Sequence, residues 1–155
     1  MKWLLDLFSS SLGREVLMAL TGLFLILFLI VHLIGNLQLL KNDGGAAFNS
    51  YAEFMGSNPL IQLVSKGNFA FILLHIIWGI MLTIRNRKAR GTVGYAQPNK
   101  SSVWASRNMG LLGTIIFIFL VLHIRHFYAE AHFGNLPTQM YDGKEAKDLY
   151  GQVAI

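Results

Sequence analysis

The sequence contains no cysteine. This absence excludes disulfide bonds, zinc sites built on thiolates, cysteine-ligated iron–sulfur clusters and cysteine nucleophiles. Any metal or cofactor would therefore need histidine, carboxylate or methionine side chains as its ligands.

Charged residues are also scarce. They make up 14% of the 155 residues, whereas hydrophobic residues make up 54%. A soluble domain has roughly a quarter charged residues, and intrinsic disorder needs high charge and low hydrophobicity. The composition therefore indicates a protein in contact with membrane lipid. The net charge of +5 does not indicate a nucleic-acid partner, because the basic residues lie between apolar runs.

Three apolar runs, at 16–34, 67–84 and 108–124, contain no Asp, Glu, Lys or Arg. Each is close to the roughly 17–25 residues that a helix needs to cross a bilayer. We predict an all-α integral membrane protein with spanning helices over about 14–40, 60–86 and 104–128. The first is too long for a signal peptide, and no cleavage site follows it. The spans are separated by an outer loop 41–59 and an inner loop 87–103, and an outer tail 129–155 follows.

The distribution of basic residues predicts the orientation. Six of the 13 basic residues lie between the second and third runs: Arg85, Arg87, Lys88, Arg90, Lys100 and Arg107. Short segments rich in Lys and Arg stay in the cytoplasm. We therefore expect a cytoplasmic N-terminus and an outward-facing tail.

The outer loop contains a segment, 48–55, with apolar residues at helical spacing. This pattern predicts a short amphipathic helix at the membrane interface. Pro59 suits the first position of the next span, because its missing N–H has no partner there in any case.

Histidines are the most informative residues. Three of the five fall one in each span: His32, His75 and His123. An ionisable side chain inside a span is costly, which makes it a candidate functional residue. The alternative is a neutral imidazole hydrogen-bonded between helices, but its occurrence in all three spans favours a function.

The depth of each histidine follows from the rise of about 1.5 Å per helical residue. Counted from Arg14 and Arg107 at the inner ends of their spans, His32 and His123 lie at about 27 Å and 24 Å. His75 lies only about 15 Å from Arg85. We therefore expect His32 and His123 to share a level, with His75 nearer the cytoplasm.

Two imidazoles at one depth on different helices satisfy the requirement of bis-histidine haem ligation. Gly35 and Gly79 lie one turn after His32 and His75, where they would give a flat ring room to approach. Phe119, one turn before His123, could pack on that ring.

A zinc or iron site at His123 and His126 is less favoured, because the spans supply no carboxylate. We expect His126 in the headgroup region and His132 in a solvated loop.

Four segments resemble the cytochrome b membrane anchor of succinate dehydrogenase and fumarate reductase, in its single-subunit, two-haem type. The resemblance covers about 12–133 and lies in Phe28-Leu29-Ile30-Val31-His32-Leu33-Ile34-Gly35-Asn36, Ala47-Phe48-Asn49-Ser50-Tyr51-Ala52-Glu53-Phe54-Met55, His75-Ile76-Ile77-Trp78-Gly79 and Leu122-His123.

The resemblance implies a five-helix bundle that holds two b haems. His32 and His123 would ligate the distal haem, and His75 the proximal haem. In that family the partner of His75 lies on a fourth helix, so the resemblance implies a single membrane-anchor domain, 1–155, that is incomplete at its C-terminus. Another polypeptide could also complete the site.

The resemblance further implies electron transfer between an iron–sulfur subunit and a membrane quinone, menaquinone in particular, with a flavoprotein as a further partner. The chain would be a non-flavin subunit of a succinate:quinone oxidoreductase in the bacterial inner membrane, acting in the respiratory chain and tricarboxylic acid cycle.

Further site residues follow from the chemistry. Haem propionates directed toward the cytoplasm need a cation, for which Arg14, Arg85 and Arg107 are the candidates. Quinone reduction takes up protons, and Glu53 is the only acid in the outer-loop helix, so it is the quinone-site candidate. The alternative function is a haem-free membrane scaffold or small transporter subunit whose histidines serve packing or proton relay.

Overall fold

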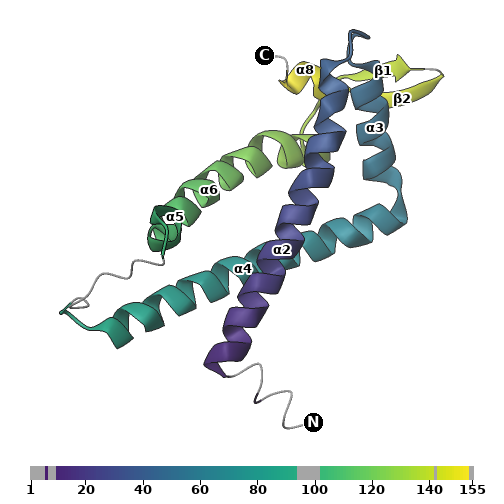
Figure 1. The fold of residues 1–155 in the computed structure, drawn as a ribbon. Coiled ribbons are helices and arrows are strands. Elements are labelled where there is room, and N and C mark those ends of the chain that lie inside the picture. The colour runs from purple at the N-terminus through teal and green to yellow at the C-terminus, as the bar shows by residue number, and fades with distance from the viewer. Residues whose placement is uncertain (1–5, 7–9, 94–101, 142, 154–155) are drawn as a thin grey trace. The chain divides into compact units, whose positions relative to one another are not determined.

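The structure is a computed structural model that describes residues 6, 10–93, 102–141 and 143–153 (Figure 1). These residues are mainly helical and divide into two compact units. Unit 1 comprises the described residues of 1–24 and 70–119, and unit 2 those of 25–69 and 120–155. Lys100, one of the six basic residues that predict the orientation, lies outside the described residues.

Three helices are long and apolar enough to cross a membrane. They are α2 (Ser11–Asn36), α4 (Pro59–Arg90) and α6 (Met109–His123). A 3₁₀-helix, η1 (Leu37–Leu40), extends α2, while a π-helix, η2 (Ile124–Ala129), and α7 (Glu130–Phe133) extend α6. The prediction of three membrane-spanning helices is confirmed at this level.

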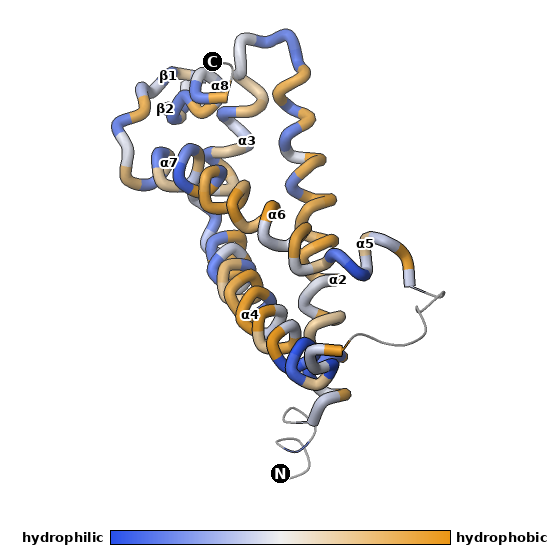
Figure 2. Tube along the Cα trace, turned by 90° about the vertical axis from the view of Figure 1, so that its left-hand side faces the viewer, coloured by the Kyte–Doolittle hydropathy of each residue, from blue (hydrophilic) through white to orange (hydrophobic). Residues whose placement is uncertain are grey.

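Apolar residues make up most of α2 and α6, which are largely orange in Figure 2. The apolar side chains of the spanning helices are largely uncovered. Leu33, Leu73 and Ile116 each expose more than half of their surface. A water-soluble protein rarely leaves so large an apolar area exposed, because its hydration is unfavourable. The chain is therefore membrane-embedded, with hydrocarbon as the solvent of these faces.

Local signals explain where α4 begins and ends. The Asn58 side-chain oxygen accepts the N–H groups of Leu60 and Ile61, at 3.0 and 3.2 Å, and Pro59 is the first helical residue. The helix continues to Arg90, four residues beyond the predicted end, and Gly91 follows with a φ of 72°. Basic residues in the last turn complement the negative end of the helix dipole.

The third span differs from the prediction at both ends. A short helix, α5 (Trp104–Arg107), precedes α6, and the helical run continues through α7 to Phe133 instead of ending near residue 128. α2 also starts at Ser11, three residues early, because the Ser10 hydroxyl accepts the Gly13 N–H at 2.9 Å.

Unit 2 contains the predicted outer-loop helix, α3 (Ala46–Ser57). Beside it lie an antiparallel hairpin of β1 (Thr138–Tyr141) and β2 (Lys144–Lys147), and the short helix α8 (Leu149–Val153) (Figure 1). The prediction of an all-α protein missed this hairpin. Tyr141 pairs with Lys144, and the two residues between them in the sequence are Asp-Gly, a favoured hairpin signal.

Candidate functional site

The His32 and His123 side chains meet within unit 2. Their ring centroids lie 5.8 Å apart and the ring planes are nearly perpendicular, at 84°. His32 comes from α2 and His123 is the last residue of α6. The structure thus brings together the two histidines that depth alone placed at one level.

A phenylalanine one turn away packs on each of these two rings. Phe28 stacks on His32 with centroids 5.4 Å apart, and Phe127 contacts His123 at 4.9 Å. Sequence reasoning named Phe119 at this site and overlooked Phe28 and Phe127, although their i, i+4 spacing to the histidines is the signal for such contacts. These contacts limit the rotation of each imidazole.

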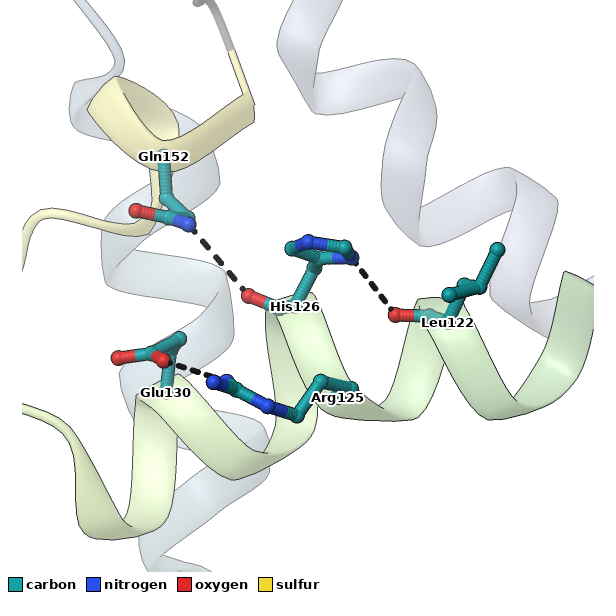
Figure 3. Close-up of polar contacts among 5 residues, drawn as sticks. All are labelled: Leu122, Arg125, His126, Glu130 and Gln152. Atoms are coloured by element: carbon teal, nitrogen blue, oxygen red, sulfur yellow. Dashed lines mark hydrogen bonds and ion pairs between the residues drawn. The ribbon is translucent and has the colours of Figure 1, made fainter.

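The π-helix η2 begins immediately after His123. Within it, His126 Nδ1 donates to the Leu122 carbonyl at 2.9 Å, because a carbonyl oxygen only accepts (Figure 3). An ion pair between Arg125 and Glu130, 2.8 Å long, spans the same segment. π-Helical turns are frequently found at functional sites, so the position of η2 directly after His123 adds weight to this site.

The donor set restricts the metal chemistry. Among the residues that the structure describes, no group of three or more His, Asp or Glu side chains could hold a bare metal ion. Two trans imidazoles suffice only when a macrocycle supplies the other metal ligands, as haem does. The His32 and His123 rings, with centroids 5.8 Å apart, are close enough for both to contact one bound group.

Gly35 has a different role from the one predicted. A methyl group at Gly35 would lie 2.7 Å from the Tyr51 ring and its hydroxyl, because α3 packs there. The space at Gly35 is therefore filled by Tyr51 and not left for a flat cofactor. Gly79 faces a side chain too: its added methyl would lie 3.2 Å from the Met18 methyl, within unit 1.

His75 lies in unit 1, half-buried in α4, and its Nδ1 is 2.9 Å from the Thr21 hydroxyl of α2. Thr21 is buried, at 5% exposure. Sequence reasoning missed Thr21, because a lone hydroxyl in an apolar span usually bonds its own helix and reveals nothing about a neighbour.

The three arginines that are candidates to compensate the charge of a haem propionate all belong to unit 1. Arg14 is half-buried in α2, and Arg85 is exposed in α4. Arg107, at the end of α5, donates to the carbonyl of Ser102. Their role toward a propionate stays a prediction.

Glu53 is exposed and lines a cavity of about 570 Å³ in unit 2. Its walls come from α3 and the hairpin and are mixed: the apolar side chains are Phe54 and Ala146, and the others are Ser50, Glu53, Ser57, Tyr141, Lys144 and Glu145. The cavity can admit a polar ligand group or water at Glu53. Asn49 and Tyr51, which the sequence places beside Glu53, point elsewhere: Asn49 binds the C-terminal segment and Tyr51 covers Gly35.

Asn68 of α4 is a further polar residue that sequence reasoning missed. It is 6% exposed, and its side-chain oxygen is buried with no hydrogen-bond partner among the described residues. Such an acceptor is costly in an apolar environment. It is available to a buried water molecule or a ligand hydroxyl.

Comparisons of the chain with protein-family models, with curated proteins and with solved structures give no match. The site itself and the resemblance of the four segments are therefore the basis for a function of this chain.

Proposed function

We propose that this chain is a haem b membrane anchor of a succinate dehydrogenase or fumarate reductase. In this role it transfers electrons between an iron–sulfur subunit and a membrane quinone. The observation that carries the proposal is the His32–His123 ring pair, 5.8 Å apart, on two apolar helices. The sequence resemblance supplies the identity of the complex.

His32 and His123 would hold the distal haem, one imidazole on each face. When bound, haem supplies a one-electron redox centre whose potential depends on its axial ligands and surroundings. The chain's contribution is to hold the two imidazoles on separate helices, with Phe28 and Phe127 packed against the rings. Membrane hydrocarbon around the apolar faces of these helices would keep water away from the bound group and strengthen electrostatic interactions there.

His75 is the proposed axial ligand of the proximal haem, with its second ligand outside this chain. The resemblance implies a five-helix bundle. The second ligand would then come from a helix that is not one of the three spans of this chain. Arg14, Arg85 or Arg107 would compensate a propionate charge from the inner side, where an unpaired carboxylate in a low dielectric is costly.

Glu53 is our candidate for proton transfer to the quinone. It is the only acid in α3, and the cavity beside it gives water a route to its carboxylate. Protons would enter from the outer side if the N-terminus is cytoplasmic, as the distribution of basic residues predicts.

Alanine substitution of the two histidines tests the proposal. In membranes from cells that produce the chain, His32→Ala and His123→Ala should each weaken affinity for the distal haem by at least about tenfold and so lower its b-type absorbance, because even the loss of a group that only supports a ligand costs 10- to 100-fold in metal affinity. Insertion should be retained, since the removal of an imidazole makes a span more apolar.

His126→Ala and His132→Ala are matched controls. Both histidines occupy the same helical run, and each Nδ1 donates to a backbone carbonyl, of Leu122 and Tyr128 respectively. Both variants should keep the distal haem. Full haem content in His32→Ala and His123→Ala would overturn the assignment of these two ligands. No b-type spectrum in the wild type would favour the haem-free scaffold instead.

A further inference from the structure

The Thr21 hydroxyl has three close neighbours in unit 1. Its Oγ1 lies 2.9 Å from the Leu17 carbonyl oxygen and 3.0 Å from that of Met18, both in its own helix. The third neighbour is His75 Nδ1, at 2.9 Å. The arrangement is held between α2 and α4, where Phe24 and Phe71 also pack with ring centroids 4.6 Å apart.

A count of hydrogen bonds favours one direction for the Thr21–His75 contact. A threonine hydroxyl has one proton, and carbonyl oxygens can only accept. If Nδ1 carries a hydrogen, Thr21 can donate to the Leu17 or Met18 carbonyl and accept from His75 at the same time, so two hydrogen bonds form. If Nδ1 has no hydrogen, the one hydroxyl proton can serve only one of these acceptors, so the arrangement with the hydrogen on Nδ1 satisfies more groups.

A neutral imidazole with its hydrogen on Nδ1 has its lone pair on Nε2. Among the described residues, no hydrogen bond reaches His75 Nε2. The ring is also held in place from the α2 side, because a methyl at Gly22 would lie only 3.2 Å from His75 Cε1. Nε2 is thus left as the open ligand atom of a fixed ring.

We propose that Thr21 is a positioning residue that fixes the tautomer and orientation of His75, so that Nε2 is available to a metal. This inference rests on the proposed function for the identity of the metal group, a haem, but the tautomer itself can be tested without it. Metal-binding histidines commonly donate their second N–H to a neighbouring acceptor, which raises the basicity of the ligand nitrogen.

The direct test is nitrogen NMR on the full chain in lipid nanodiscs, without haem and with ¹⁵N-labelled histidine. A His75→Gln variant identifies the His75 signals. In the wild type, His75 should show the Nδ1–H tautomer. Thr21→Val keeps the size of the side chain but removes the acceptor, so the signal should shift to a mixture of tautomers or to Nε2–H.

Two variants separate a positioning role from a merely structural one. Thr21→Ser keeps the acceptor and should restore the Nδ1–H signal. Thr114→Val is the matched control, because the Thr114 hydroxyl bonds only the Gly110 carbonyl, at 2.8 Å. That variant should leave the His75 signal unchanged. A wild-type His75 with Nε2–H, or an unchanged Nδ1–H tautomer in Thr21→Val, would overturn the proposal.

A second readout uses the native complex in membranes. There, the His75-dependent haem signal is the part of the b-type spectrum that His75→Ala removes. Thr21→Val should weaken haem affinity at this site about 10- to 100-fold, and Thr21→Ser should restore it. A confirmed tautomer without any His75-dependent haem would support the role of Thr21 and count against the proposed function. A confirmed haem signal that Thr21→Val leaves unchanged would overturn the role of Thr21 alone.

Discussion

Asn49 joins the outer-loop helix to the C-terminal segment through a side chain with no exposed surface. Its amide nitrogen donates to the Tyr141 hydroxyl at 2.9 Å and to the Asp148 carboxylate at 3.0 Å. Its oxygen accepts the Tyr150 N–H at 2.8 Å. Every hydrogen-bonding direction of this amide except one lone pair is therefore used, which explains why an amide is buried there.

Asn49→Ala should loosen the C-terminal segment. The Tyr150 N–H and its neighbours would lose their buried partner, at a cost of about 1–3 kcal/mol for each group left unsatisfied. Trypsin cleaves after Lys144 and Lys147 when the C-terminal segment is detached from α3. The cleavage rate should therefore rise roughly 5- to 150-fold, in proportion to the population of the detached state.

Ser50→Ala provides the control for this prediction. Ser50 is the next residue in α3 and is exposed, so its loss should leave the cleavage rate within a factor of about two. Equal cleavage rates in the wild type and Asn49→Ala would show that the Asn49 bonds do not hold the segment.

The helix α3 depends on two glycines at its start. Gly44 and Gly45 have φ angles of 64° and 88°, values that other residues rarely adopt. The surroundings of the two differ. A methyl at Gly45 would lie 2.5 Å from Tyr150 Cβ, whereas nothing lies within 4 Å of one at Gly44.

Substitution of each glycine separates backbone strain from collision. Gly44→Ala should cost only the left-handed strain of about 1–2 kcal/mol. Gly45→Ala should cost the same strain and also displace Tyr150, so that α8 detaches from α3. The same trypsin assay should therefore rank the variants as Gly45→Ala fastest, Gly44→Ala intermediate and wild type slowest. If the two variants were cleaved equally fast, the Tyr150 contact would have no energetic role.

Sequence patterns predict the helical elements of this chain well, because their signals are local. The apolar spacing over 48–55 predicts α3, and Pro59 marks the first residue of α4. The hairpin was missed because its strands have only four residues each and carry mixed polar side chains, which leaves Asp142-Gly143 as its main signal.

The candidate site is predicted less completely, for a physical reason. Helical rise gives the depth of a residue, and His32 and His123 were paired on depth alone. Contacts such as Thr21 with His75, or Tyr51 with Gly35, depend on how each helix is rotated about its axis. Rotation is set by packing against other segments, which a single sequence does not reveal.

At the scale of the whole molecule, the lipid-facing helices determine where the chain resides. The spanning helices leave their apolar side chains uncovered. Polar residues are concentrated outside the apolar stretches, at helix ends, in loops and in the hairpin (Figure 2). The length of an apolar helix does not indicate which of its ends faces the cytoplasm, so the orientation of the chain needs separate evidence. The basic end of α4, with Arg85, Arg87, Lys88 and Arg90, is the feature that predicts it.

Because the chain contains no cysteine, single introduced cysteines can report orientation without background. Asn42, Thr92 and Thr138 are exposed and uncharged, so their substitution leaves the distribution of basic residues unchanged. In intact bacterial cells, a membrane-impermeant maleimide should label Asn42→Cys in the outer loop and Thr138→Cys in the outer tail. Thr92→Cys, which follows the basic end of α4, should react only after the membrane is permeabilised. Labelling of Thr92→Cys alone in intact cells would show the inverted orientation, and it would place Glu53 and its cavity on the cytoplasmic side.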